Sequence, residues 1–197
     1  MPLCCVIRLS ALLPPDTARE RITAAFPGIP VHFEIVADRD WDAEWRKSLK
    51  PLRFGKRLWV CPVGQDCPDP AGISLLLEPG LAFGTGTHPT TAMCLAWLDR
   101  LALDGQLLKD ARVLDYGCGS GILAIAAAIL GASTVRAVDI DPQALIATDA
   151  NAERNGVRPQ LQVTADPSLP PAGTDLLVAN ILAGPLVALA PAFAAGV

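Results

Sequence analysis

A glycine-rich stretch, Asp115-Tyr-Gly-Cys-Gly-Ser-Gly121, contains the residues whose types and spacing point most clearly to ligand binding. Gly117, Gly119 and Gly121 favour a tight turn and let the backbone approach a ligand closely. The apolar run that follows predicts a helix, whose N-terminus favours a polar or anionic group. Asp139 lies 22 residues after Gly117, and an acid at about that distance reaches a ribose diol in nucleotide-binding sheets.

The spacing of the glycines distinguishes between two kinds of nucleotide. The pattern is G-x-G-x-G, and Ile122 stands where a dinucleotide-binding turn has its third glycine. A glycine turn with a ribose-binding acid but no pyrophosphate fingerprint is typical of a site for S-adenosylmethionine, which has no phosphates. A purely structural turn is the alternative. Asp141 is a second candidate for the ribose, although Asp141-Pro142 has the pattern of a helix cap followed by proline.

Asn180 is a second candidate functional residue, in the segment Val178-Ala-Asn-Ile-Leu-Ala-Gly184. It follows an apolar run that predicts a strand, and ligands of open α/β sheets bind beyond the carboxyl ends of strands. The Asn180 side chain offers a neutral carbonyl acceptor and an NH₂ donor group. Two interpretations stay open: a turn residue, or an acceptor that orients an amine for attack.

A glycine-rich segment from Glu78 to Thr91 is the third candidate. In one interpretation it is a surface loop, with Thr90 as the cap of the next helix. In the other it covers the cofactor, with Phe83 against the ligand and Thr91 hydrogen-bonded to the amino-acid end of the ligand. His88 is either a contact in this loop or a structural cap, and we do not expect it to be a catalytic base.

The elements that must position these residues alternate between strand and helix from residue 112 onward. This rhythm predicts a parallel sheet with helices on both faces. The expected strands are Arg112–Asp115, Thr134–Asp139, Gln160–Thr164 and Asp175–Ala179, preceded by two short ones at Arg57–Val60 and Ile73–Leu77. The expected helices are Thr90–Leu103, Ile122–Leu130, Pro142–Asn155 and one that begins at Pro185.

The first 60 residues have a different pattern, which predicts a small α+β piece and a linker. Short strands are expected at Cys5–Leu9 and Val31–Val36, with a helix over Asp16–Ala25 between them. A second helix with Trp41 and Trp45 on one face would end before Pro51. We therefore expect an amino-terminal domain over residues 1–37, a linker over 38–60 and a catalytic domain over 61–197.

Composition excludes several classes of function. The 197 residues are 51% hydrophobic, which excludes global disorder, and the net charge of −4 argues against a general binder of nucleic acid. A basic excess lies between Arg46 and Arg57, where a solvated face and a contact surface for an acidic partner are both possible. The six cysteines match no zinc pattern, so we expect no metal. With no signal peptide and a punctuated apolar carboxyl-terminal segment, we expect a cytoplasmic protein with no membrane partner.

Five motifs in order resemble the PrmA family of bacterial methyltransferases, which methylate a large-subunit ribosomal protein, the eleventh in the usual naming. The motifs are Gly80-Leu-Ala-Phe-Gly-Thr-Gly-Thr-His-Pro-Thr-Thr91, Asp115-Tyr-Gly-Cys-Gly-Ser-Gly121, Val138-Asp-Ile-Asp-Pro142, Asn151-Ala-Glu-Arg-Asn-Gly156 and Asn180-Ile-Leu-Ala-Gly184.

The resemblance implies a class I S-adenosylmethionine-dependent methyltransferase with a Rossmann-like, doubly wound sheet of order 3-2-1-4-5-7-6. It places Thr91, Gly117, Asp139 and Asn180 at cofactor-binding positions, and the substrate would be lysine ε-amines and an α-amine. It also implies that the chain begins within a ferredoxin-like domain and ends after the fourth strand. We expect such a fragment to self-associate and to show little methyl transfer.

Three other functions remain possible from the sequence. A methyltransferase of nucleic-acid amines usually has Asn/Asp-Pro-Pro-aromatic where this chain has Asn180-Ile-Leu-Ala183, so the stacking face for a flipped base is missing. A nicotinamide-dependent reductase is disfavoured by Ile122. A fragment without catalytic activity is the third. The leading interpretation has a protein substrate and no direct nucleic-acid substrate.

Overall fold

The structure is a computed structural model that describes residues 8–35, 49–78, 88–105, 109–168 and 173–196. The chain divides into two compact units, Met1–Asp42 and Ala43–Val197. The domain boundaries expected after residues 37 and 60 remain predictions. The helix expected around Trp41 and Trp45 lies outside the described residues.

The first unit contains one described helix, α1 (Arg19–Ala25), where the sequence predicted a helix over Asp16–Ala25. None of the α1 side chains is buried, and the Arg19 guanidinium lies 5.5 Å from the centre of the Phe33 ring. The two strands expected here do not form in their described parts, residues 8–9 and 31–35. The described residues of this unit contain no partner strand, and one or two short strands alone are marginal in water.

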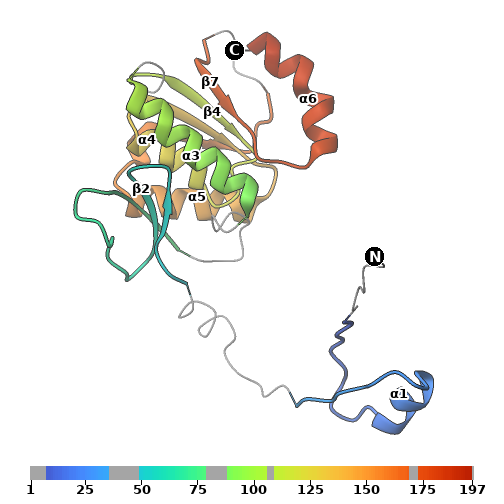
Figure 1. The fold of residues 1–197 in the computed structure, drawn as a ribbon. Coiled ribbons are helices and arrows are strands. Elements are labelled where there is room, and N and C mark those ends of the chain that lie inside the picture. The colour runs from blue at the N-terminus through green and yellow to red at the C-terminus, as the bar shows by residue number, and fades with distance from the viewer. Residues whose placement is uncertain (1–7, 36–48, 79–87, 106–108, 169–172, 197) are drawn as a thin grey trace, which may run out of the picture. The chain divides into compact units, whose positions relative to one another are not determined.

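The second unit contains two sheets and the helices that pack on them (Figure 1). The smaller sheet has the order β1-β2-β3, with β1 antiparallel and β3 parallel to β2; the larger is fully parallel, in the order β6-β5-β4-β7. The strands are β1 (Leu52–Phe54), β2 (Leu58–Pro62), β3 (Ile73–Leu77), β4 (Arg112–Tyr116), β5 (Thr134–Val138), β6 (Leu161–Thr164) and β7 (Leu176–Val178). The helices are α3 (Pro89–Asp104), α4 (Ile122–Ile129), α5 (Pro142–Arg154), the short 3-10 helix η1 (Arg158–Gln160) and α6 (Ala183–Gly196).

The order of the larger sheet confirms the expected arrangement of the first four strands of a class I methyltransferase. In chain order its strands are β4, β5, β6 and β7, so the sheet runs 3-2-1-4. The chain moves outward from β4 through β5 to β6, and right-handed crossovers place α4 and α5 on the same face. It then returns to the other side of β4 to add β7. This reversal at β4 places the loops after β4 and β7 beside each other, at the carboxyl ends of the strands.

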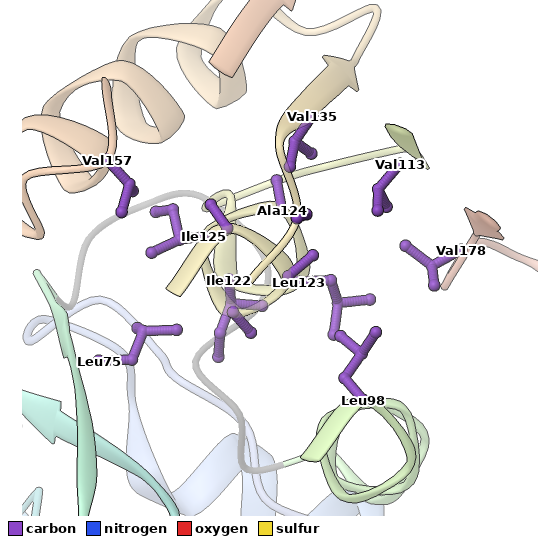
Figure 2. Close-up of a cluster of buried hydrophobic side chains, with 14 of the residues drawn as sticks. Leu75, Leu98, Val113, Ile122, Leu123, Ala124, Ile125, Val135, Val157 and Val178 are labelled. Carbon is purple, nitrogen blue, oxygen red and sulfur yellow. The ribbon is translucent and has the colours of Figure 1, made fainter. Parts of the chain in front are cut away.

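Helix α4 forms the centre of the core because its sequence has no polar residue. Every α4 side chain from Ile122 to Ala128 is buried. Figure 2 shows Val113, Val135 and Val178 arranged around α4, with Leu98 of α3 on another side. These three valines belong to neighbouring strands, so one face of the parallel sheet packs against a helix that directly follows the glycine-rich turn.

The opposite face of the sheet packs against α6. Alternation along β4 directs Leu114 and Tyr116 away from α4. The Tyr116 ring meets Phe193 of α6 edge-on, with the ring centres 5.2 Å apart. Helices therefore pack against both faces of the sheet, as the alternation of strands and helices predicted. Figure 1 shows α6 beside β7 at the edge of the sheet.

A buried acid attaches the smaller sheet to α3. Asp99 of α3 is 1% exposed, and its Oδ2 accepts hydrogen bonds from the backbone N–H groups of Lys56, at 2.6 Å, and Arg57, at 3.2 Å. The Arg57 guanidinium lies 3.7 Å from the other carboxylate oxygen. Part of the basic stretch noted in the sequence is thus compensated within the fold. Strand β1, with two of three residues exposed, was not predicted.

Candidate functional site

The glycine-rich turn connects β4 to α4 in a conformation that favours glycine. Gly117, Gly119 and Gly121 have φ values of +82°, +56° and +80°. The N–H groups of Gly117 and Cys118 donate to the Val138 carbonyl at 2.8 and 2.9 Å, which fixes the turn to the end of β5. Positive φ values disfavour residues with a Cβ. The turn therefore has the local conformation that the glycine spacing predicted.

A carboxylate from the neighbouring strand binds this turn. Asp139 directly follows β5; its Oδ2 accepts from the Gly119 N–H at 2.8 Å and its Oδ1 from the Asp141 N–H at 3.0 Å. The side chain of Asp141 instead caps α5, because its Oδ1 accepts from the Gln143 N–H at 2.9 Å. The structure brings Asp139 and Gly119 together and gives Asp141 the cap role that its Asp-Pro pattern indicated.

Thr91 and Asn180 form a direct hydrogen bond. Thr91 is 1% exposed in the first turn of α3, and its hydroxyl accepts from Asn180 Nδ2 at 2.8 Å. Asn180 lies two residues beyond the end of β7 and is half-buried. The Asn180 NH₂ group donates to Thr91. The side-chain carbonyl oxygen of Asn180 is therefore the atom that could accept a hydrogen bond from a substrate amine.

The strand register places these groups at one edge of the sheet. Tyr116 of β4 is opposite Val138 of β5, and Asp115 of β4 is opposite Val178 of β7. The glycine turn, Asp139 and Asn180 follow these three parallel strands directly. Because the carboxyl ends of parallel strands lie on the same side of a sheet, the backbone amides of the turn, the Asp139 carboxylate and the Asn180 carboxamide lie near one another there.

Asp115 is a buried acid whose environment the sequence did not reveal. It is 1% exposed, and its Oδ2 accepts from the Ala124 N–H of α4 at 2.9 Å. Its Oδ1 has no hydrogen-bond partner among the described residues. Burial is the main cause that raises the pKa of Asp115 to about 7; the hydrogen bond from the Ala124 N–H opposes it, and the charge of nearby Asp139 adds to it. Only its place in an otherwise apolar strand was visible in the sequence.

Cys118 and His88 have structural roles near the site. Burial raises the pKa of the Cys118 thiol to about 12, so this cysteine is a neutral thiol rather than a nucleophile. His88 caps α3, since its Nδ1 accepts from the Thr90 N–H at 3.3 Å and Pro89 takes the first helical position. The possibility of Thr90 as the cap is therefore wrong: Thr90 lies inside the helix. Phe83 lies outside the described residues.

Ile140 is a candidate contact residue that the sequence reasoning missed. Its side chain is 84% exposed, directly after Asp139 at the sheet edge. An exposed isoleucine next to a candidate ribose-binding acid offers an apolar surface suited to a base. The signal was present in the sequence as an isoleucine between two aspartates, a position with no obvious structural demand for an apolar side chain.

The described ranges contain neither a metal-binding cluster nor a membrane-spanning helix. Within them, no group of three or more His, Cys, Asp or Glu side chains is placed to hold a metal ion. Nor does any described helix have the length and apolarity needed to cross a membrane.

Comparisons with known proteins identify the family. The model of the family described as "Ribosomal protein L11 methyltransferase (PrmA)" matches residues 15–197. A protein named ribosomal protein L11 methyltransferase from Marinomonas sp. (strain MWYL1) is 54% identical over 168 residues, which cover 85% of this chain and 55% of that protein. One of the same name from Nitrosococcus oceani is 51% identical over 202 residues, covering 98% of this chain and 67% of that protein.

A solved structure agrees with these relatives. The crystal structure of ribosomal protein L11 methylase from Lactobacillus delbrueckii subsp. bulgaricus matches with a TM-score of 0.63 and 32% identity, covering 76% of this chain and 75% of that one. The chain spans about half to two thirds of the length of the curated relatives it matches. The match to the family model, the sequence identities and the shared fold agree: this chain belongs to the PrmA family of ribosomal protein L11 methyltransferases.

Proposed function

We propose that this chain binds S-adenosylmethionine at the edge formed by the ends of β4, β5 and β7, and that it methylates amino groups of ribosomal protein L11. The substrate groups are lysine ε-amines and an α-amine. The observation that carries the proposal is the bond from the Gly119 N–H to the Asp139 carboxylate, 2.8 Å long, beside the Thr91–Asn180 pair. Family membership supports the choice of substrate.

The residues at this edge suit S-adenosylmethionine better than a dinucleotide. Asp139 is half-buried and would accept hydrogen bonds from a ribose diol, and the exposed Ile140 would contact the base. Ile122 stands at the position of the third glycine of a dinucleotide-binding turn, the glycine that allows close packing of the helix against the strand. When bound, S-adenosylmethionine supplies a methyl group on a sulfonium: a bond forms between the amine nitrogen and the methyl carbon as the carbon–sulfur bond breaks, and the sulfur leaves as a neutral thioether.

Asn180 is the residue that we assign to the amine. Its carbonyl oxygen would accept a hydrogen bond from the amine N–H and direct the nitrogen lone pair, while Thr91 holds the side chain in place. The amine must be neutral, and with a lysine pKa of about 10.4 only about one in 2,500 is neutral at pH 7. Partial burial of the amine lowers its pKa and raises this fraction. The contribution of Asn180 is therefore alignment rather than proton removal.

A titration and a transfer assay test this proposal. The purified chain is titrated by calorimetry with S-adenosylmethionine and, separately, with NAD; we expect heat from the first only. Labelled S-adenosylmethionine is then supplied with purified ribosomal protein L11 and with ribosomal RNA as separate acceptors, and the enzyme in this assay is a protein that spans the full length of the curated relatives. Label in the protein, lost in the Asp139→Ala variant, supports the proposal. Binding of NAD alone, or label in the RNA alone, would refute it.

A further inference from the structure

Helix α5 contacts the glycine-rich turn from the side of the protein interior. Thr148 is fully buried in α5 and Asn151, one turn later, is 1% exposed. Thr148 Oγ1 donates to the Gly119 carbonyl at 3.1 Å, and Asn151 Nδ2 donates to the Ser120 carbonyl at 3.0 Å. Two successive carbonyls of the turn thus bind two buried donors on one helix. Buried polar side chains are costly unless they are paired, so these bonds fix the turn firmly.

Helix α5 and the turn are packed closely at Gly121. A Cβ added to Gly121 would lie 2.9 Å from both Oγ1 and Cγ2 of Thr148, closer than real Cβ atoms approach their neighbours. A trans peptide is planar, so fixing the direction of a carbonyl also fixes the N–H of the next residue. Thr148 and Asn151 therefore set the orientation of two successive peptide planes in the turn that contains Gly119.

Asn151 also connects the turn to β3. Its Oδ1 accepts from the Glu78 N–H at 3.1 Å. Asn155, the C-cap residue directly after α5, contacts β3 but not the glycine turn: its Oδ1 accepts from the Leu76 N–H at 2.8 Å and its Nδ2 donates to the Leu76 carbonyl at 2.7 Å. Its Nδ2 also donates to the Asn151 carbonyl at 2.8 Å. Only Asn151 binds the glycine turn through its side chain, so Asn155 provides an internal control.

We propose that Thr148 and Asn151 are positioning residues for S-adenosylmethionine: they orient the glycine turn through hydrogen bonds from α5, without themselves touching the ligand. The inference rests on the proposed function, because it concerns the same ligand and the same turn. A positioning role and a purely structural role predict different results. In a positioning role, removing either donor would weaken ligand binding more than an equally destabilising change elsewhere in α5.

Thr148 allows the two roles to be separated with two conservative variants. Thr148→Val keeps the branched shape and removes the hydroxyl, whereas Thr148→Ser keeps the hydroxyl and removes a methyl group. If the hydrogen bond positions the turn, Thr148→Val binds S-adenosylmethionine about tenfold more weakly, as expected for loss of a buried hydrogen bond, and Thr148→Ser binds like the unmodified chain. If Thr148 only packs, Thr148→Ser is the weaker binder, which would overturn the inference.

The asparagines provide the matched comparison. Asn151→Asp keeps an acceptor for the Glu78 N–H but loses the donor to Ser120, and Asn155→Asp loses the donor to Leu76. The dissociation constant is measured by calorimetry and the Tm by thermal unfolding. We expect both variants to lower the Tm but only Asn151→Asp to weaken binding about tenfold. If Asn151→Asp and Asn155→Asp bind S-adenosylmethionine with equal affinity, only this inference is overturned. If the unmodified chain does not bind S-adenosylmethionine, the proposed function is overturned and this inference with it.

Discussion

Asn180 Nδ2 donates a hydrogen bond of 2.8 Å to the hydroxyl of Thr91, although the two residues lie 89 positions apart in the chain. Thr91 belongs to a helix that precedes the parallel sheet, and Asn180 to the loop after its edge strand β7. The bond means that the orientation of the Asn180 carboxamide depends on α3. Asn180, the residue that we assign to the substrate amine, is thus held in place by the buried Thr91.

The first prediction follows from this dependence. In a protein that spans the full length of the curated relatives, Asn180→Ala should lower kcat for methyl transfer to ribosomal protein L11 by about 10²-fold and leave the affinity for S-adenosylmethionine nearly unchanged, because misalignment acts on the transition state. Thr91→Val should lower kcat less. In the double variant the Thr91 change should add little, since its partner is already absent. Fully additive losses, measured in a double-mutant cycle, would show that the two residues act independently.

The second prediction separates Asp139 from Asp141. Asp139→Ala should weaken S-adenosylmethionine binding by about 1.5–3 kcal/mol, the range for a hydrogen bond to a charged group. Asp141→Ala should instead lower the free energy of unfolding by about 0.5–2 kcal/mol, through loss of the α5 cap, and leave the affinity unchanged. Calorimetric titration and denaturant unfolding of both variants measure the two effects. The reverse pattern would transfer the ribose contact to Asp141.

The larger sheet was predictable because its signals are local. Strand β4 begins at the predicted residue, Arg112, and ends one residue later than predicted, at Tyr116, and α4 ends one residue before its predicted end at Leu130. Apolar runs bounded by glycine or proline determine these elements, and their alternation implies a parallel sheet. Strand β1 could not be seen in this way. It has three residues, two of them exposed, and exists because it pairs with β2 and is attached to Asp99 through the following turn.

The site was predictable as a set of residues but not as a network. The glycine spacing and a strand-end acid indicated Gly119 and Asp139, and the resemblance indicated Thr91 and Asn180. The bonds that join them depend on strand order and helix packing, which no local pattern encodes. Burial of Asp115 is likewise a property of the assembled sheet, since the same strand sequence at the edge of a sheet would leave the carboxylate hydrated.

The third prediction concerns the close approach of the two loops. A Cβ on Gly117 would clash with Cγ2 of Ile181, the neighbour of Asn180. Gly117→Ala should lower the free energy of unfolding by about 1–3 kcal/mol, from positive φ and this clash. Gly105 also has positive φ, at +70°, with nothing within 4 Å of its Cβ position.

Gly105→Ala therefore measures the backbone cost alone. Adding Ile181→Ala should recover part of the stability lost in Gly117→Ala, because it removes the clashing methyl group, and should recover none in Gly105→Ala. Denaturant unfolding of the single and double variants gives these differences. Equal losses in Gly117→Ala and Gly105→Ala would mean that the loop after β7 does not constrain the turn.

The fourth prediction uses the pKa of Asp115, which burial raises from 3.8 to about 7. A carboxyl with a raised folded-state pKa favours the native state while it is protonated. Its contribution is complete below pH 4 and is lost as the pH rises from about 4 to about 7, because the unfolded chain releases the proton first. The loss is on the order of 4 kcal/mol, at about 1.4 kcal/mol for each pH unit between the two values.

Asp115→Asn should remove this pH dependence, because an amide does not ionise and its oxygen can still accept from the Ala124 N–H. We expect the variant to have a flatter profile of unfolding free energy between about pH 4 and 7, and to be at least as stable as the unmodified chain at higher pH. Asp175→Asn is the control. Arg112 holds the pKa of Asp175 down at about 2, so this exposed carboxyl titrates below the window and its removal should leave the slope there unchanged. A profile for Asp115→Asn parallel to that of the unmodified chain would mean that Asp115 is ionised in the native state across this range.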